Sequence, residues 1–310
     1  MKRKGKRGQN KNKPKQHKSF HSNKRRRRER PRPTNSTTQM SRWGGRPAKL
    51  LRKVTLVEGV VGSRLPVHTL TFANPLGEPS LGVRIDHGDT VKVCVPNYKP
   101  KSYSMSAERV GEFDITVKIY PNGRASGYLN QVHIGETIDV FRKGSKVRHP
   151  GNKVGLVAYG VGITEILPMA VAELRKKDAQ SVVLLWASRT YGDTFWHEQL
   201  RSLKEEHGER FEYVLILSRE EKEGVLHGRI TPDVLQKVFV EKWQGGEEEG
   251  EGEGGKTTER KVEQDGSEEE MREHSVRFLA IGTKEMMRST DAMLESIGFP
   301  MGKHALLRYP

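Results

Sequence analysis

The sequence predicts a two-domain α+β protein, in which an antiparallel β-barrel precedes an α/β domain built on a doubly wound parallel sheet. Three observations lead to this fold class. Short β-type runs separated by turn residues fill residues 51–148, apolar strands alternate with helices over residues 149–310, and basic charge is concentrated at the N-terminal end. Many short strands with frequent turns are typical of small barrels, whereas alternating strands and helices are typical of parallel sheets.

The first 50 residues are interpreted as a basic tail. They hold 19 of the 55 Lys and Arg residues and one of the 39 acids, which leaves 36 bases and 38 acids for the rest of the chain. Almost no aliphatic side chains occur before about residue 47, and such a segment buries too little apolar surface to offset its conformational entropy. We therefore expect residues 1–50 to be disordered, and the formal net charge of +16 belongs to this appendage rather than to the folded body.

The run from Arg25 to Arg28 allows two interpretations of the tail. Clustered arginines are typical of a nuclear localisation signal or of an arm that contacts polyanions, whereas a solvated tail without a dedicated partner has the same composition. The single Cys94 excludes an intrachain disulfide framework and a four-cysteine metal site, so a reducing compartment is expected. The cytoplasm or nucleus is favoured, and an organelle stays open. No run approaches the ~18 apolar residues of a transmembrane segment, and no secretory signal is expected.

The predicted barrel occupies residues 51–148. Its strands are short β-type runs, and Gly, Pro, Asn and Asp separate them. The predicted strands are 54–61, 67–72, 90–95, 113–120 and 137–141. This pattern favours antiparallel pairing in a small barrel or sandwich.

The predicted α/β domain occupies residues 149–310. Four apolar runs of strand length precede helical stretches in turn: strands 154–159, 182–187, 213–218 and 276–281, and helices 166–176, 194–207, 232–243 and 284–297. Buried strands alternating with helices indicate a parallel sheet covered on both faces. Residues 244–275 contain 12 acids and four bases, and their Gly- and Glu-rich composition predicts a disordered surface insertion.

Two glycine turns lie at the carboxyl ends of predicted parallel strands. Gly160 and Gly162 open one helix, followed by Thr164, and Gly282 opens the last helix, followed by Met286. Glycine lets backbone amides approach a ligand, and a helix N-terminus favours an anion such as pyrophosphate. A tight turn also needs glycine for steric reasons alone, but two such turns at the edge where open α/β sheets bind ligands favour a nucleotide site.

The barrel region contains two polar motifs. The first places a cation, an aromatic ring and hydroxyls on an extended segment, and the second offers consecutive amides and a hydroxyl after a turn glycine. The motifs are Lys101, Ser102, Tyr103 and Ser104, and Gly123, Arg124, Ala125 and Ser126. A phosphate-bearing aromatic cofactor needs such groups, although two strand ends with polar caps are the alternative interpretation.

In this order and spacing, the motifs resemble the ferredoxin-NADP reductase superfamily, nearest its NADH-cytochrome reductase and nitrate-reductase flavin branch. Residues 101–104 resemble the Arg-x-Tyr-Ser/Thr flavin motif, 123–126 the Gly-x-x-Ser pyrophosphate motif, and 160–164 the segment Gly-Thr-Gly-Ile-Thr. Residues 184–200 resemble the strand, turn and helix that hold the ribose, and 282–286 resemble part of Cys-Gly-Pro-x-x-Met. The resemblance covers about residues 52–310 apart from the acidic insertion.

The resemblance implies an FAD-binding barrel, an NAD(P)-binding α/β domain and an oxidoreductase that passes electrons from NADH or NADPH through FAD to an unidentified acceptor, a separate redox protein among the options. It places Tyr103 and Ser104 at the reacting end of the flavin as catalytic residues. The remaining implied cofactor contacts are Lys101, Ser102, Lys118, Tyr120, Gly123, Arg124, Ala125 and Ser126 for FAD, and Gly160, Gly162, Thr164, Arg189, Asp193, Gly282 and Met286 for the nicotinamide nucleotide. Asp193 favours NADH, whereas Arg189 favours a 2'-phosphate, so cofactor choice stays open.

Three residues depart from the family pattern. Lys101 stands where the family has arginine, Glu165 where it has proline, and Ile281 where it has cysteine. A lysine offers a point charge instead of a bidentate fork. These departures motivate an alternative, a flavin- or nucleotide-binding protein that is catalytically weak or inactive. A second alternative is a nucleic-acid-associated protein that acts through its basic tail.

Overall fold

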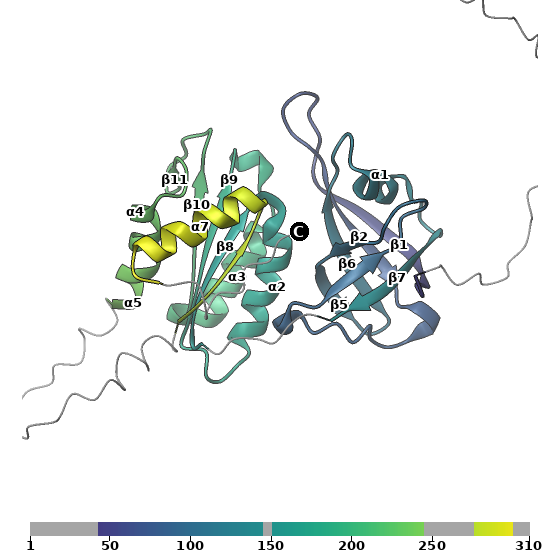
Figure 1. Cartoon of the computed structure of the whole chain (residues 1–310), viewed down its shortest axis with the longest axis horizontal. Helices are drawn as coiled ribbons and strands as arrows, with labels where there is room; N and C mark the ends of the chain where they lie inside the picture. The colour runs from purple at the N-terminus through teal and green to yellow at the C-terminus, as the bar shows by residue number, and fades with distance from the viewer. Residues whose placement is uncertain (1–42, 145–150, 245–275, 300–310) are drawn as a thin grey trace, which may run out of the picture. The chain divides into compact units, whose positions relative to one another are not determined.

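The computed structural model describes residues 43–144, 151–244 and 276–299, all of which lie within one structural unit, Met40–Pro310. These residues form an antiparallel sheet followed along the chain by a parallel sheet (Figure 1). The fold class predicted from sequence is therefore confirmed. The predicted disorder of residues 1–42 and of the acidic insertion, 245–275, falls outside the described residues.

The first sheet has seven strands in the order β4-β3-β7-β1-β2-β6-β5, and all its pairings are antiparallel. The strands are β1 (Arg46–Val57), β2 (Val67–Ala73), β3 (Thr90–Val93), β4 (Lys101–Tyr103), β5 (Met105–Arg109), β6 (Glu112–Lys118) and β7 (Thr137–Lys143). Alternate residues point into one apolar core, where Phe72 and Phe113 stack with ring centroids 5.5 Å apart. Three further elements of this region are η1 (Pro75–Gly77), η2 (Ile85–His87) and α1 (Arg124–Gln131).

The predicted boundary of the tail at residue 50 is wrong. Strand β1 begins at Arg46, and it ends at Val57, four residues before the predicted end at 61. Ala48 and Leu50 are buried in the barrel core, so five residues assigned to the basic tail belong to the fold. The charges of Arg46 and Lys49 hid this strand, because Arg46 precedes the two buried apolar residues and the exposed Lys49 lies between them.

The second sheet is parallel throughout, in the order β11-β10-β9-β8-β12. Its strands are β8 (Lys153–Tyr159), β9 (Ser181–Ser188), β10 (Phe211–Leu217), β11 (Leu226–His227) and β12 (Val276–Ile281). The helical elements of this region are η3 (Gly160–Gly162), α2 (Ile163–Leu174), η4 (Tyr191–Asp193), α3 (His197–His207), η5 (Gly208–Arg210), α4 (Pro232–Leu235), η6 (Gln236–Glu241), α5 (Lys242–Gln244) and α7 (Lys284–Ser296).

Helices cover both faces of the parallel sheet, as the apolar strands predicted (Figure 1). One buried cluster joins α2 and α3 to β8 and β9 and contains Trp186. The other joins η6 and α7 to the opposite face and contains Phe239. Because successive side chains of a strand point to opposite faces, Leu156 lies in the first cluster and Val157 in the second.

Several predicted helix boundaries differ from the structure. Helix α2 begins at Ile163 rather than 166, because the glycine turn is only three residues long. Helix α3 begins at His197 rather than 194, because Trp196 has a φ of 62°, which no helical residue adopts. The predicted helix 232–243 is divided by the π-helical stretch η6. Helix α1 was not predicted, and it is the element that residues 124–126 open.

A buried ion pair fixes the end of α2 that is remote from the glycine turn. Glu173 on α2 is fully buried and pairs with Arg277 on β12, which is 4 % exposed. Lys176 donates a second hydrogen bond to the Glu173 carboxylate at 2.9 Å. Two cations on one buried carboxylate offset its desolvation, and loss of the carboxylate leaves a buried guanidinium without its counter-charge.

We therefore expect Glu173→Leu to lower the free energy of unfolding by about 3–5 kcal/mol, measured by urea denaturation followed by circular dichroism. Glu209→Gln is the control, because the Glu209 side chain is 89 % exposed although it also pairs with Lys242; its effect is expected to stay within about 0.5 kcal/mol. Equal losses in the two variants would contradict the role assigned to the buried pair.

Candidate functional site

The first glycine turn lies at the carboxyl end of β8, as predicted. Gly160 has a φ of +53°, in the left-handed region that favours glycine. The indole of Trp186 donates a hydrogen bond to the Gly160 carbonyl at 2.9 Å, and the Thr164 hydroxyl donates to the Val161 carbonyl at 2.9 Å. The Thr164 hydroxyl is therefore used within the turn. The Ile163 amide is also used within the turn, since it donates to the Gly160 carbonyl, and α2 has no side-chain cap.

The second glycine turn fits closely against the first. A Cβ atom on Gly162 would lie 2.6 Å from the carbonyl oxygen of Ile281, and a Cβ atom on Gly282 would lie 2.7 Å from the ring of Tyr159. The hydroxyl groups of Tyr159 and Thr290 are 2.7 Å apart, which joins β8 to α7. The two predicted nucleotide turns are therefore held together by close backbone approach, which only glycine permits.

Helix α7 begins at the second turn. Thr283 is its N-cap, and its hydroxyl accepts a hydrogen bond from the Met286 amide at 3.3 Å. The Met286 side chain is 42 % exposed, so it forms part of the surface beside the turn. The predicted site residues Gly160, Gly162, Gly282 and Met286 thus share one edge of the parallel sheet.

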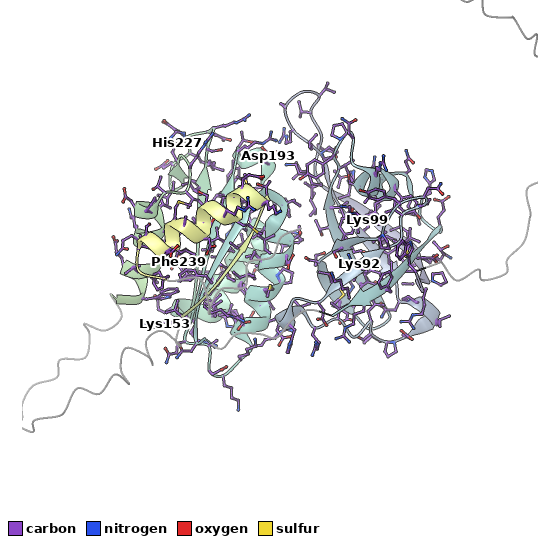
Figure 2. All side chains as sticks on the ribbon, in the orientation of Figure 1. Lys92, Lys99, Lys153, Asp193, His227 and Phe239 are labelled. Carbon is purple, nitrogen blue, oxygen red and sulfur yellow. The ribbon has the colours of Figure 1, made fainter. Side chains whose placement is uncertain are left out.

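Asp193, in η4 after β9, is buried and engaged within the protein. One of its carboxylate oxygens accepts from Arg189 at 3.1 Å, and the other accepts from the Thr190 hydroxyl at 3.0 Å. Lys118 of β6 lies 3.8 Å from the same carboxylate. Burial lowers the pKa of Lys118, which Asp193 opposes. Figure 2 shows Asp193 at the carboxyl edge of the sheet, away from Lys153 at the start of β8.

The loop between β1 and β2 also reaches this segment. Arg64 donates to the Gly192 carbonyl at 3.0 Å, and Arg189 donates to the Ser63 carbonyl at 3.1 Å. Sequence reasoning missed Ser63 and Arg64, because neither belongs to a motif and their partners lie more than 120 residues away. These contacts, with the pair of Lys118 and Asp193, connect the antiparallel sheet to the loop after β9.

The first polar motif forms β4 at the edge of the antiparallel sheet. Lys101 and Ser102 are exposed, and Tyr103 packs partly into the barrel core. Burial raises the pKa of Tyr103 to about 12, so the phenol stays protonated near neutral pH. Lys92 of the neighbouring β3, labelled in Figure 2 with Lys99, has a lowered pKa, first through burial and then through nearby lysines.

The second polar motif opens α1. A Cβ atom on Gly123 would lie 2.2 Å from the Ser126 hydroxyl, so the turn requires glycine. The Ser126 hydroxyl accepts a hydrogen bond from the Tyr120 amide at 3.2 Å and is therefore used in the turn. The first-turn amides, including those of Arg124 and Ala125, have no acceptor within the helix and face the N-terminal end of α1.

One aromatic ring connects the two polar motifs. Arg124 lies over the Tyr98 ring at 5.0 Å from the centroid, and Lys101 lies 5.9 Å from it. Two cations from different motifs therefore share one ring, and one of them, Arg124, is the first residue of α1. Cations together with helix N-terminal amides are the donor set that binds phosphate groups, so the residues present fit the diphosphate of a dinucleotide. Sequence reasoning missed Tyr98 because it belongs to neither motif and meets their cations only in the folded structure.

Ser104, directly after β4, donates a hydrogen bond to Glu165 in the first turn of α2, with 2.5 Å between the oxygen atoms. The structure thus brings the first polar motif into direct contact with the first glycine turn. Glu165 was noted in the sequence only as a departure from a proline, and the pairing had no sequence signal because 61 residues separate the two partners.

Comparison with known families agrees with this division of the chain. Residues 64–148 match the family described as the oxidoreductase FAD-binding domain, and residues 156–244 match the oxidoreductase NAD-binding domain. The second match includes the glycine turn and η4, and the first includes both polar motifs.

Relatives with similar sequences are NADH-cytochrome b5 reductases 1. The protein of Debaryomyces hansenii is 33% identical over 180 residues, which cover 56% of this chain and 61% of that protein. The protein of Aspergillus oryzae is 31% identical over 216 residues, which cover 62% of this chain and 72% of that protein. The chain thus spans about three fifths of the Debaryomyces protein and 57% of that from Ajellomyces capsulatus, which is 35% identical.

Two solved structures share the fold. The cytochrome b5 reductase domain of Ulva prolifera nitrate reductase has a TM-score of 0.63 at 18% identity, covering 85% of this chain and 97% of that domain. The ferredoxin NADP+ reductase from Neisseria gonorrhoeae with bound FAD and NADP has a TM-score of 0.58 at 16% identity, and the match covers 85% of this chain and 97% of that protein. Within the described part of the chain, no helix has the length and apolar character to cross a bilayer.

The contact between the two glycine turns predicts a steric effect. We expect Gly162→Ala to destabilise the protein by about 1–3 kcal/mol, because the added Cβ meets the Ile281 backbone and cannot rotate away. Gly127→Ala is the matched control: Gly127 lies in α1 with open space at its Cβ position, so its stability should stay equal or rise. Thermal unfolding followed by circular dichroism measures both, and an unchanged midpoint for Gly162→Ala would show that the turns are not in close contact.

Proposed function

Because the chain belongs to the FAD- and NAD-binding oxidoreductases of cytochrome b5 reductase type, we propose that it oxidises NADH through bound FAD and passes the electrons to a small haem protein. The observation that carries the proposal is the direct contact between the two motif regions. Ser104 of the flavin-type motif is hydrogen-bonded to Glu165 of the nucleotide-type turn. Hydride transfer requires the two cofactors to meet, and the contact of the two motifs supports such a meeting point.

In this proposal FAD binds along β4, β6 and the N-terminus of α1. Lys101, Arg124 and the amides of residues 124–126 would hold its diphosphate, and Tyr103 would pack against its ring. Bound FAD supplies the electron-carrying chemistry, since it accepts a hydride and releases electrons. The lysine at position 101 lacks the bidentate fork of an arginine, but Arg124 lies beside the same Tyr98 ring and offers that fork.

The nicotinamide nucleotide would bind at the carboxyl edge of the parallel sheet, where open α/β sheets bind ligands. Gly160 and Gly162 let its phosphates approach the first turn of α2, and Gly282 and Met286 would lie beside the nicotinamide end. Ile281 offers only apolar packing there. Ile281 and the half-buried Tyr159 would exclude water from the nicotinamide, which would favour hydride transfer over side reactions with water.

We propose NADH rather than NADPH as the donor. The Asp193 carboxylate pairs with Arg189 and lies near Lys118, so the cation expected to attract a 2'-phosphate is already neutralised. A 2'-phosphate placed at this loop would have to compete with the buried carboxylate for Arg189 and Lys118. The relatives' names, NADH-cytochrome b5 reductase, agree with this preference and motivate cytochrome b5 as the acceptor to test.

The purified protein is expected to retain FAD after incubation and desalting, and then to oxidise NADH with ferricyanide and with cytochrome b5 as acceptors. Absorbance spectroscopy measures both the bound flavin and the turnover. Bound flavin without reduction of either acceptor would favour the inactive flavin-binding alternative. Absence of bound flavin would defeat the proposed function itself.

Asp193→Asn tests the assignment of the donor. The variant keeps the shape of the side chain but removes its charge, which releases Arg189 to attract a 2'-phosphate. We expect the ratio of kcat/KM for NADPH to that for NADH to rise at least about tenfold, which corresponds to about 1.4 kcal/mol of transition-state binding. Asp178→Asn, on an exposed position, is the control and should leave the ratio unchanged. An unchanged ratio in Asp193→Asn would show that this loop does not select the nucleotide.

A further inference from the structure

The hydrogen bond between Ser104 and Glu165 has a defined direction. A serine hydroxyl carries one proton, and an ionised carboxylate only accepts hydrogen bonds. With 2.5 Å between Ser104 Oγ and Glu165 Oε2, the Ser104 proton lies between these two oxygen atoms. Because this proton is used, only the lone pairs of the Ser104 oxygen are left for a ligand. Ser104 can therefore accept a hydrogen bond from a ligand but cannot donate one.

The position of Glu165 suits a carboxylate that is held in place. It lies in the first turn of α2, where the helix dipole stabilises a negative charge. Helix α2 packs against β5, the strand that follows Ser104, and its neighbours Ile163 and Ile166 are fully buried. A carboxylate on such an anchored turn loses little conformational entropy when it binds a hydroxyl, and charge-assisted hydrogen bonds are the strong ones.

We propose that Glu165 is a positioning residue that holds the Ser104 hydroxyl as an acceptor toward the flavin. This inference rests on the proposed function and assigns a role that the flavin-type motif by itself does not contain. The N5 atom of oxidised flavin accepts hydrogen bonds, whereas in reduced flavin it carries a proton and donates. A hydroxyl fixed as an acceptor therefore favours the reduced form and makes the bound FAD easier to reduce.

The carboxylate also has a direct effect through its charge, and that effect has the opposite sign, because a negative charge disfavours reduction. A double-mutant cycle separates the two. Glu165→Ala removes both effects when Ser104 is present, but only the charge effect when Ser104 is replaced by alanine. The difference between the two backgrounds is the part that acts through Ser104.

The experiment measures the midpoint potential of bound FAD, by redox titration followed by absorbance, in the wild-type protein, Ser104→Ala, Glu165→Ala and the double variant. Glu165→Ala is expected to shift the potential more negatively in the wild-type background than in the background of the Ser104→Ala variant. The expected difference is about tenfold in the preference for reduced flavin, or about 30 mV for a two-electron couple. Equal shifts in the two backgrounds would overturn the proposal.

Two further variants keep the result interpretable. Glu165→Gln preserves the shape but lets an amide donate to Ser104, so a part of the shift is expected; it serves if Glu165→Ala fails to fold. Glu198→Ala removes an acid from the first turn of α3 and should leave the potential unchanged. If the pair of Ser104 and Glu165 only stabilises the fold, Glu165→Ala lowers the unfolding temperature while the potential shifts equally in the two backgrounds.

Failure of the wild-type protein to bind FAD would defeat the proposed function and this inference together, whereas FAD binding with equal shifts defeats the inference alone.

Discussion

Helix α2 is the element on which both sheets depend, because one side of it closes the parallel sheet while its first turn holds Ser104. Its residues Ile163 and Ile166 lie in a buried cluster with β8 and β9, and that cluster also includes Val57 of β1 and Val67 of β2. At its far end, the buried Glu173 binds Arg277 of β12. The helix is thus held at both ends, and this restraint fixes the glycine turn from which it begins.

Fixed geometry at this turn has a direct chemical consequence. The groups that remain for phosphates are backbone amides and exposed cations, since the hydroxyl groups of Thr164 and Ser126 already serve partners within the protein. Backbone amides cannot change rotamer, so they bind phosphate with little loss of entropy. The proposed phosphate sites therefore rely on backbone and cations for affinity, and the hydroxyls of Thr164 and Ser126 act by holding the turns in place.

Most of the fold could be predicted from the sequence, and the exceptions have physical reasons. The parallel strands were found because they are continuously apolar, as strands buried on both faces must be. Helix α1 was missed because its sequence includes Gly127 and buries little beyond Ala125, Ser126 and Leu129. The start of β1 was missed because Arg46 and Lys49 flank Ala48, so the first five residues of a 12-residue strand were interpreted as part of a basic tail.

Less of the candidate site could be predicted, because its decisive contacts join residues far apart in the chain. Asp193 and Arg189 looked like competing signals for two nucleotides, and the structure shows that they form one ion pair. Glu165 was noted in the sequence only because it stands where the family has proline, and the structure shows it hydrogen-bonded to Ser104. The roles of the motif residues toward FAD and the nicotinamide nucleotide remain predictions. Electron transfer from NADH to bound FAD is measured by mixing the FAD-loaded protein with NADH under anaerobic conditions and following flavin absorbance. We expect one equivalent of NADH to bleach one equivalent of flavin, and a flavin that stays oxidised in excess NADH would contradict the proposed function.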